Sequence, residues 1–349
     1  MSLERALTLS TEPEVLESNP GQALQTLSCT YQLTVAICTY NGAQRLPTVL
    51  DCLRHQITPD GCRWEILIID NNSSDDTAAV VEAYQQNWPD AVSLRYCFEP
   101  RQGTAYARQR AITQARSELV GFIDDDNLPA ESWVTAACAF ASTHPTVGAF
   151  GSRINGQFES PLPPNFERIQ PFFAITHRGS QAHRYERKGR VLPPAAGLVV
   201  RRQVWLDHVP TQLHLLGAKA DHRLAGEDLE ALSYIQKTGW EIWHNPAMEI
   251  DHYIPDWRLE RTYLMSFFRS IGLSRYVTRM LRFSVWHRPF GLLLYVLNDS
   301  RKVILHLLRY RRTIQTDIVA ACEWQLFLST LVSPLYFLGK LWRSRAIRE

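Results

Sequence analysis

The strongest constraint on the fold is a regular alternation of strand-like and helix-like segments between residues 33 and 124. Four short apolar runs have the composition of buried strands: "LTVAICTY" (33–40), "WEILIID" (64–70), "VSLRYC" (92–97) and "ELVGFID" (118–124). The intervening segments have a helical spacing of apolar residues and cover 44–56, 73–86 and 103–115. This alternation predicts an α/β fold with a mostly parallel, Rossmann-like sheet, right-handed crossovers and flanking helices.

Polar residues follow each of the four predicted strands at its carboxyl end. Ligands of parallel sheets bind beyond these ends, so we expect the polar groups to converge on one rim. Ordinary loop polarity is the alternative, although it leaves three consecutive acids after the fourth strand unexplained. The rim residues are Thr39 and Asn41, then Asp70 to Asn72, then Glu99 and Arg101, and finally Asp124 to Asp126.

The three acids in "GFIDDDN" require a positive partner, because adjacent carboxylates repel one another and are costly near a core. Asp124 and Asp126 are two positions apart at a strand end, so both can lean toward the rim. Hard oxygen ligands in this arrangement suit Mg²⁺ or Mn²⁺ carrying a diphosphate. Capping of a helix at 130–142 is the alternative, and it explains one acid better than three.

Glycine-rich phosphate loops are absent from the sequence. Neither GxxxxGK[ST] nor a GxGxxG after the first strand is present, which disfavours P-loop ATPases and dinucleotide dehydrogenases. The remaining possibility for the ligand is a nucleoside diphosphate held by a metal. Asp70 could accept hydrogen bonds from a base or ribose, and Arg108 could contact phosphate or base edges.

The second half of the chain is less regular. Residues 155–190 are rich in Pro, Gly and charge, and we expect a long loop with little structure. Residues 190–205 contain a short strand, 226–240 are expected to be a helix that begins with acids, and 241–254 consist of strand pieces. Helical periodicity dominates beyond Pro255.

At this point the motifs resemble a known family. "VAICTYNG", "ILIIDNNSSDDT", "QGTAYARQRAI", "GFIDDDN" and "AGEDLE" occur in the order and spacing of the family 2 glycosyltransferases with the GT-A fold, over roughly residues 33–255. The chain also looks like bacterial, including cyanobacterial, exopolysaccharide members of that family. The resemblance implies a nucleotide-sugar donor, usually linked to uridine diphosphate (UDP), and inverting transfer to an acceptor hydroxyl of a growing glycan or lipid-linked saccharide.

The resemblance also implies roles for individual residues. Asp124 and Asp126 fill the family's Asp-x-Asp motif, with Asp126 as the more direct metal ligand, and Asp125 would face the ribose or the sugar. Asn71 stands where relatives commonly have Asp, which puts the base contact there in doubt. The residues that would contact the nucleotide-sugar are Thr39, Tyr40, Asn41, Asp70, Asn71, Arg108, Asp124 and Asp125, with Gly197 allowing close approach of the sugar. A strand irregularity is the alternative for Gly197.

The catalytic base of inverting transfer is a carboxylate that takes the acceptor's proton on the face opposite the leaving diphosphate. Asp228 matches the family's base position, and Glu227 would orient the acceptor or the sugar. Stabilisation of a helix start is the alternative for both acids. Some relatives use a His at the position of His252 as a further metal ligand, and a structural role is the alternative there.

The domain organisation follows from composition. We expect a loose arm at 1–30, a transferase domain at 31–255 and a basic, mostly helical extension at 256–349. Residues 257–349 carry 16 Lys and Arg against 5 Asp and Glu, whereas residues 1–256 carry 21 against 30. The basic extension indicates peripheral contact with an anionic membrane, packing on the transferase domain, or both. Gly272 interrupts its apolar pattern, so the pattern does not predict one unbroken helix.

The location expected for the chain is the cytoplasm, in part at the cytoplasmic face of the membrane. The polar, acidic start is not expected to be a signal peptide, and the segment 324–342 is not a clean membrane span. Seven scattered cysteines without CxxC pairs indicate reduced thiols. We expect no nucleic-acid partner.

Two other functions remain open from the sequence. A sugar-nucleotide nucleotidyltransferase would use a related sheet and metal, but "TYNGAQRLP" lacks the basic, glycine-rich loop it requires. A non-catalytic nucleotide-sugar-binding scaffold is the second alternative, and intact Asp124, Asp126 and Asp228 argue against it. A Gln-x-x-Arg-Trp motif is absent, so the transfer of one sugar per encounter is expected.

Overall fold

The predicted alternation of strands and helices is present in the computed structural model, which describes residues 31–186, 191–217 and 224–346. The predicted arm at 1–30 lies outside the described residues. In chain order, this part of the fold comprises β1 (Tyr31–Thr39), α1 (Leu46–Arg54), β2 (Trp64–Asp70), α2 (Thr77–Gln86), β3 (Ser93–Phe98), α3 (Thr104–Gln114), β4 (Ser117–Asp124), β5 (Asn127–Pro129) and α4 (Trp133–Thr143).

The first four strands pair in parallel, in the spatial order β3-β2-β1-β4. Their carboxyl ends therefore meet at one edge. The sheet continues with antiparallel β8 (Leu198–Arg201) next to β4, then β6 (Val147–Phe158), β9 (Glu241–Ile254) and β5. Strands β6 and β9 also pair in parallel, and β7 (His183–Arg184) pairs with β9. The predicted α/β fold with a mostly parallel central sheet is confirmed, and the strand pieces expected at 241–254 form one long strand.

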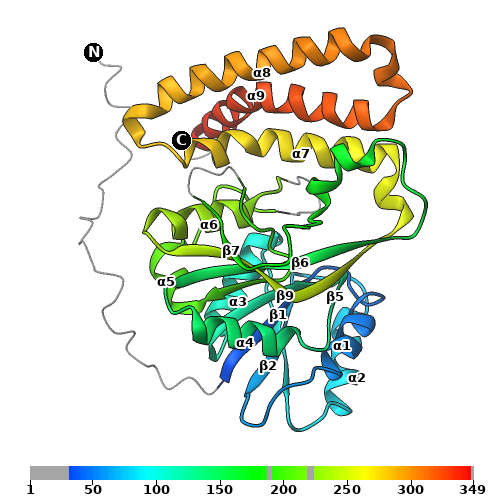
Figure 1. Cartoon of the computed structure of the whole chain (residues 1–349), viewed down its shortest axis with the longest axis vertical. Coiled ribbons are helices and arrows are strands. Elements are labelled where there is room, and N and C mark those ends of the chain that lie inside the picture. The colour runs from blue at the N-terminus through cyan, green and yellow to red at the C-terminus, as the bar shows by residue number, and fades with distance from the viewer. Residues whose placement is uncertain (1–30, 187–190, 218–223, 347–349) are drawn as a thin grey trace.

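Helices cover both faces of the sheet, and two hydrophobic cores lie beneath them (Figure 1). One face packs against α1, α2 and α4. The other packs against α3, α5 (Arg202–His208) and α6 (Glu227–Lys237). Gly121 of β4 makes room for the buried ring of Trp133, because a Cβ on this glycine would lie 2.6 Å from that ring. The strand ends are thus fixed by close packing on both sides.

The segment after β6 is more ordered than the sequence indicates. It forms two 3₁₀ turns, η2 (Phe166–Arg168) and η3 (Gln170–Phe173), before β7. Phe166, Ile169 and Phe173 are buried and form a third core with residues of the C-terminal helices, among them Leu264 and Phe268. The prediction of a long loop with little structure is wrong here, because these apolar residues are spaced too irregularly to show their burial in the sequence.

The C-terminal extension is helical, as predicted, and its long helices lie side by side at one end of the molecule (Figure 1). It comprises η4 (Asp256–Leu259), α7 (Arg261–Met280), η5 (Val285–His287), α8 (Arg288–Tyr310), η6 (Arg311–Gln315) and α9 (Ile318–Ala346). Helix α7 runs unbroken through Gly272. A Cβ there would lie 2.5 Å from Ser329 Cβ and 2.8 Å from the carbonyl oxygen of Leu326, so this glycine allows α7 and α9 to pack closely.

Helix α9 contains the segment of the described chain that comes closest to a membrane span. Ile318–Gly339 is long and apolar enough to cross a bilayer by length and composition, and 44% of its most apolar window is buried inside the protein. Val319, Cys322 and Leu326 from this segment belong to the third core. Burial against the rest of the chain is therefore sufficient to explain much of its apolar character.

Candidate active site

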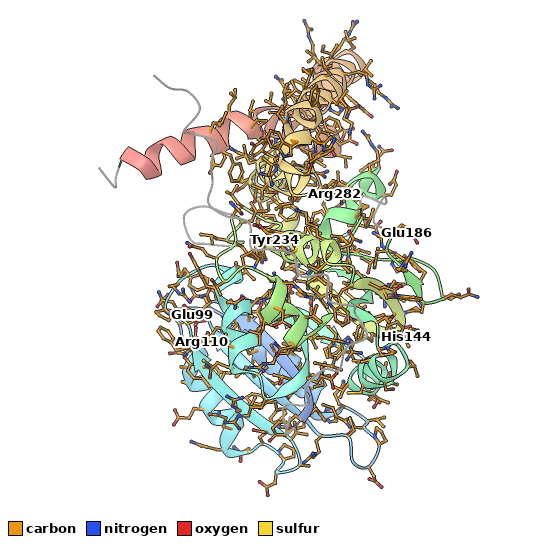
Figure 2. All side chains as sticks on the ribbon, turned by 90° about the vertical axis from the view of Figure 1, so that its left-hand side faces the viewer. Glu99, Arg110, His144, Glu186, Tyr234 and Arg282 are labelled. Carbon is orange, nitrogen blue, oxygen red and sulfur yellow. The ribbon has the colours of Figure 1, made fainter. Side chains whose placement is uncertain are left out.

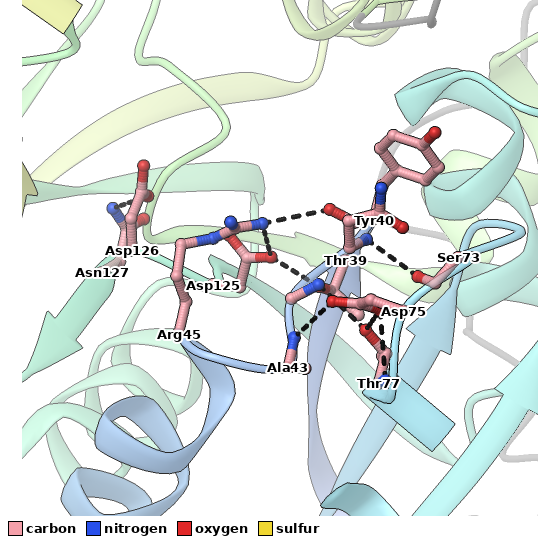
Figure 3. A network of polar contacts seen from close by, with 12 residues as sticks. Thr39, Tyr40, Ala43, Arg45, Ser73, Asp75, Thr77, Asp125, Asp126 and Asn127 are labelled. Carbon is pink, nitrogen blue, oxygen red and sulfur yellow. Dashed lines mark hydrogen bonds and ion pairs between the residues drawn. The ribbon is translucent and has the colours of Figure 1, made fainter. Parts of the chain in front are cut away.

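Asp125 links the loop after β1 to the acidic turn after β4, which consists of Asp124, Asp125 and Asp126. Arg45, just before α1, donates from Nε and Nη2 to the two carboxylate oxygens of Asp125 at 2.9 and 2.8 Å. This bidentate arrangement is the strong form of an arginine–carboxylate pair. Thr39 Oγ1 also donates to Asp125 at 2.5 Å, and Arg45 donates to the carbonyl of Tyr40 (Figure 3). Asp125 is therefore firmly oriented by its own protein contacts.

Sheet pairing brings Asp126 and His252 together from distant parts of the chain. β5 pairs antiparallel with β9, with Asn127 opposite His252, and the backbone N–H of Tyr253 donates to the carbonyl of Asp126 at 3.1 Å. His252 Nε2 consequently lies 3.4 Å from Asp126 Oδ2. His252 Nδ1 lies 3.0 Å from the carbonyl oxygen of Phe173. Because a carbonyl can only accept, Nδ1 carries the proton and Nε2 presents a lone pair.

Arg258 of η4 is the cation between these two side chains. Its Nη1 lies 2.8 Å from Asp126 Oδ2 and 3.1 Å from His252 Nε2. Burial by itself raises the pKa of the Asp126 carboxyl, but the neighbouring Arg258 guanidinium opposes this and favours the ionised carboxylate. The Asp126 carboxylate and the Nε2 lone pair of His252 thus point to the same position, which the Arg258 guanidinium occupies.

Arg108 of α3 connects the acidic turn to the start of α6. Its Nη1 donates to Glu227 Oε1 at 2.5 Å, and its Nη2 lies 3.6 Å from Asp124 Oδ1. Burial raises the pKa of Asp124 and of Glu227, and in both cases Arg108 opposes the shift. Glu227 also packs against Gly217, where a Cβ would lie 2.8 Å from the carboxyl carbon. Glu227 is 7% exposed and is positioned chiefly by Arg108.

Asp228 extends from the first turn of α6 into the same region and is half-buried. Its Oδ2 accepts the backbone N–H of Ala195 at 3.0 Å, and its Oδ1 accepts the N–H of Leu229 at 2.8 Å. Each oxygen keeps a further lone pair, since a carboxylate has about four acceptor positions. The carboxylate is therefore held in one orientation and can still accept a proton.

Asn41 and Asp70 are held by hydrogen bonds to the loop after β2. Asn41 adopts a positive φ of 50°, donates its backbone N–H to Ser73 Oγ at 2.9 Å, and accepts the N–H of Ser74 at 2.8 Å. Asp70 is 3% exposed and accepts from the N–H of Ser73 and the hydroxyl of Tyr96 at 2.9 and 2.7 Å. Both side chains hold the two loops together.

Asn71 stabilises the loop after β3. Its amide nitrogen donates to the carbonyls of Glu99 and Arg101 at 3.3 and 2.7 Å, and its amide oxygen accepts the N–H of Gly103 at 2.8 Å. An Asp could not donate those two hydrogen bonds, which gives the Asn at this position a structural reason. The ring of Tyr40, in contrast, is 40% exposed beside the rim.

Gly197 is required by the packing of the sheet. Its φ is +67°, and a Cβ there would lie 2.4 Å from Ser152 Oγ and 2.5 Å from Ile250 Cδ1. The structural alternative for this glycine therefore explains its presence without a ligand. The close approach of a sugar to Gly197 stays a prediction.

A single cavity of about 820 Å³ joins these groups. Thr39, Tyr40, Asn71 and Arg108 line it, whereas Asn41, Asp70 and Gly197 lie outside its lining. The polar rim predicted from the strand ends is therefore continuous with the start of α6. The carboxylates and imidazole that line the cavity are Asp124, Asp125, Asp126, Glu227, Asp228 and His252.

The predicted metal ligands are only partly assembled. Among the described residues, no group of three or more His, Cys, Asp or Glu side chains is arranged to hold a metal ion. Asp126 and His252 converge, while Asp124 faces Arg108. Two protein ligands still fit Mg²⁺ or Mn²⁺, because these ions usually bind few protein groups and complete their coordination with substrate phosphates and water. The backbone carbonyl bonded to His252 Nδ1 is also a usual partner of a metal-binding imidazole.

Sequence reasoning missed Arg45 and Arg258, and it named Arg108 without pairing it with an acid. The acids themselves were the signal, since three adjacent carboxylates need cations, but pairing across the sheet cannot be read from spacing alone. The helix-cap alternative for these acids is wrong, because α4 begins only at Trp133. The pairs are Arg108 with Asp124, Arg45 with Asp125 and Arg258 with Asp126.

The fold belongs to the GT-A type of glycosyltransferase. The mannosyltransferase PcManGT of Pyrobaculum calidifontis, solved with GDP-Man and Mn²⁺, matches with a TM-score of 0.50 and 18% identity over 86% of this chain and 88% of that one. Residues 34–203 match the sequence profile described as Glycosyl transferase family 2. Residues 34–203 thus form a glycosyltransferase family 2 domain.

Two curated relatives illustrate how far the sequence similarity extends. Glycosyltransferase AglE of Haloferax volcanii is 23% identical over 190 residues, which cover 54% of this chain and 59% of the relative. A GalNAc(5)-diNAcBac-PP-undecaprenol beta-1,3-glucosyltransferase of Campylobacter jejuni is 31% identical over 96 residues, or 28% of this chain and 30% of the relative. The matched part spans well under two thirds of either relative.

Proposed function

We propose that this chain is an inverting, metal-dependent glycosyltransferase. It moves a sugar from a nucleotide diphosphate, with UDP as the expected carrier, to a hydroxyl of a growing glycan or lipid-linked saccharide. The observation that carries the proposal is the single cavity that Asp126, His252 and Asp228 line together. This supports a diphosphate-binding group and a proton acceptor around one space.

The proposed base is Asp228. Inverting transfer is one in-line displacement at the anomeric carbon, so the acceptor hydroxyl must lose its proton on the face opposite the leaving diphosphate. The two backbone N–H groups that bind Asp228 fix its carboxylate before substrate arrives. Glu227 acts through Arg108 as a positioning residue, because its carboxylate is already bound by that guanidinium.

The proposed metal ligands are Asp126 and His252. A bound Mn²⁺ or Mg²⁺ would supply a positive charge that stabilises the departing diphosphate. Arg258 must leave its present position for a cation to be held by both side chains, because its Nη1 lies within 3.1 Å of each. Arg258 is therefore a competitor for the metal in the free protein and is free to contact phosphate once displaced.

The proposed donor and metal can be tested together with the full-length chain. We expect thermal unfolding to shift upward with Mn²⁺ and one class of sugar nucleotide, and the same mixture to release nucleoside diphosphate slowly by donor hydrolysis. Stabilisation without hydrolysis for every donor would favour the scaffold alternative. Release of inorganic pyrophosphate from a nucleoside triphosphate and a sugar phosphate would favour the nucleotidyltransferase alternative.

The membrane-facing surface proposed here is the outer face of α8. Phe290, Leu293, Leu294 and Leu297 are 72%, 58%, 68% and 60% exposed, an unusual degree for large apolar side chains on successive turns. The extension also carries the basic excess of the chain. An apolar helix face combined with cationic side chains suits an anionic bilayer surface. We place the protein at the cytoplasmic face of a membrane, where a lipid-linked acceptor would be present.

Leu293→Glu combined with Leu297→Glu is expected to abolish most binding to anionic vesicles. Each exposed leucine contributes about 1.5–3 kcal/mol when it is buried in an apolar medium. We therefore expect the affinity for vesicles to fall more than tenfold, by about 100-fold at the lower value. Co-sedimentation with phosphatidylglycerol vesicles measures this. Leu162→Glu, which changes an exposed leucine of the transferase domain, is the matched control. Equal sedimentation of all three proteins would refute the assignment of this surface.

A further inference from the structure

The cavity of the proposed active site extends beyond the donor groups to the C-terminal helices. Its far end is lined by Arg275 and Arg279 of α7, by Arg282 just after α7, and by Lys302 of α8; we call these four residues the arginine cluster. Arg275 and Arg279 are four residues apart on α7, so they lie on one face of this helix, and Arg282 follows three residues later. Figure 2 shows Arg282 at the junction between the long helices and the transferase domain, above Tyr234 of α6.

Charge is unevenly distributed along this cavity. All of the acids that line it belong to the donor end or to the start of α6. At the far end, Arg279 forms a two-point ion pair with buried Asp299. That one carboxylate faces a cluster of four cationic side chains. The far end of the cavity therefore has an excess of positive charge.

Arg275 is the member of the cluster with an uncommitted guanidinium. Within the residues that the structure describes, the guanidinium of Arg275 forms no hydrogen bond or ion pair, and it lies 5.8 Å from the centre of the Phe172 ring. Burial, together with repulsion from Arg279 and Arg282, lowers the pKa of Arg275 to about 10, although Asp299 opposes the shift. A half-buried cation in such surroundings is costly unless an anion is recruited.

The cluster is close to the proposed base. Ser274 Oγ and Thr278 Cγ2, on the same stretch of α7 as Arg275, would lie 3.6 and 3.7 Å from a Cβ on Gly226. Gly226 directly precedes Glu227 and Asp228 at the start of α6. A ligand held by the cluster would therefore reach the side of the cavity where the acceptor hydroxyl must lose its proton. The donor diphosphate is expected at the acidic turn after β4, beside Asp126 and His252.

We propose that the arginine cluster binds a phosphate or diphosphate group carried by the acceptor. This inference rests on the proposed function and adds the chemical class of the acceptor to it. Guanidinium groups suit phosphate because their planar fork donates two parallel hydrogen bonds to its oxygens. Tyr295 and Asn298 of α8 line the same end of the cavity and add neutral polar groups. Helix α8 carries both Lys302 and the exposed apolar face, so the phosphate can belong to a lipid or to a soluble sugar phosphate.

The test is the binding of inorganic pyrophosphate to the full-length protein in EDTA, which removes binding through a metal. We expect Arg275→Ala to weaken pyrophosphate binding at least about tenfold by calorimetry. Arg269→Ala is the matched control, since Arg269 is an exposed arginine of the same helix that does not line the cavity. Arg275→Lys should retain part of the affinity, because it keeps the charge and loses the fork.

Thermal unfolding separates binding from folding in these variants. Without an anion, Arg275→Ala should be at least as stable as the parent protein, because the guanidinium makes no ion pair and is repelled by its neighbours. Pyrophosphate should raise the unfolding temperature of the parent and of Arg269→Ala, and much less that of Arg275→Ala. Equal pyrophosphate binding by the parent and Arg275→Ala would overturn the inference, as would equally tight binding of glucuronate, a carboxylate without phosphate.

Two further arms identify the source of the phosphate. Farnesyl diphosphate in neutral detergent should bind more tightly than pyrophosphate if the acceptor is lipid-borne, and with equal affinity if it is a soluble phosphate; both results support the phosphate site. A protein that hydrolyses a sugar nucleotide but does not bind pyrophosphate would refute only this inference. A protein that binds pyrophosphate through Arg275 but hydrolyses no sugar nucleotide would refute only the proposed function.

Discussion

Asp228→Asn is expected to lower the turnover of donor about 10²–10⁴-fold, the usual contribution of a general base. The substitution keeps the size of the side chain and leaves an oxygen that can accept one of the two backbone hydrogen bonds, but the amide cannot take a proton from the acceptor. Release of nucleoside diphosphate from the donor found by the thermal-shift screen measures the effect. Binding of UDP with Mn²⁺ should stay within about twofold of the parent, because Asp228 is not among the proposed metal ligands.

Asp90→Asn is the control for this experiment, since it makes the same chemical change at an exposed position outside the cavity. Its turnover should match that of the parent. If Asp228→Asn also turned over normally, the base would have to be another group, and the position of Asp228 in the cavity would be structural. Loss of UDP binding together with turnover would instead point to a disturbed start of α6.

Asp126→Ala should weaken the binding of Mn²⁺, and through it the binding of UDP, by at least about tenfold. Arg258→Ala should have the opposite effect on Mn²⁺ alone, with affinity raised about fivefold, because the competing guanidinium is removed. Calorimetry with Mn²⁺ in the absence of nucleotide measures both variants without reference to activity. Two substitutions at one ion pair thus change the same dissociation constant in opposite directions.

The contrast between these two variants makes the metal proposal testable at the level of the site. Weaker Mn²⁺ binding in both would mean that Arg258 supports the site instead of competing for it. Unchanged Mn²⁺ binding in Asp126→Ala would remove this aspartate from the ligand set. Asp51→Ala, at an exposed aspartate of α1, controls for non-specific loss of an acid.

The sequence was sufficient to predict the first half of the fold because local pattern and tertiary structure agree there. Runs such as "WEILIID" are buried along their whole length in β2, and the helices between strands begin and end close to the predicted positions. The convergence of Thr39, Asn71 and the three acids on one edge followed from parallel pairing alone. Asp228 was brought to the same cavity as expected, although its role is still a proposal.

The remaining features depend on contacts between distant segments. Arg258 meets Asp126 only because β5 pairs with β9 in one register, which no spacing in the sequence reveals. Gly272 was misread for the same reason. It looks like an interruption in a local pattern, whereas it is explained by helix α9, which packs against it.

The apolar residues of the segment between β6 and β7 share one interior with α7 and α9, and this limits how the protein can be divided. A chain cut after residue 255 would leave Phe166, Ile169 and Phe173 without the side chains that cover them. Engineered chimeras that exchange the terminal helices between relatives should therefore carry residues 158–176 along with them. The segment and the helices that cover it are then exchanged as a single block.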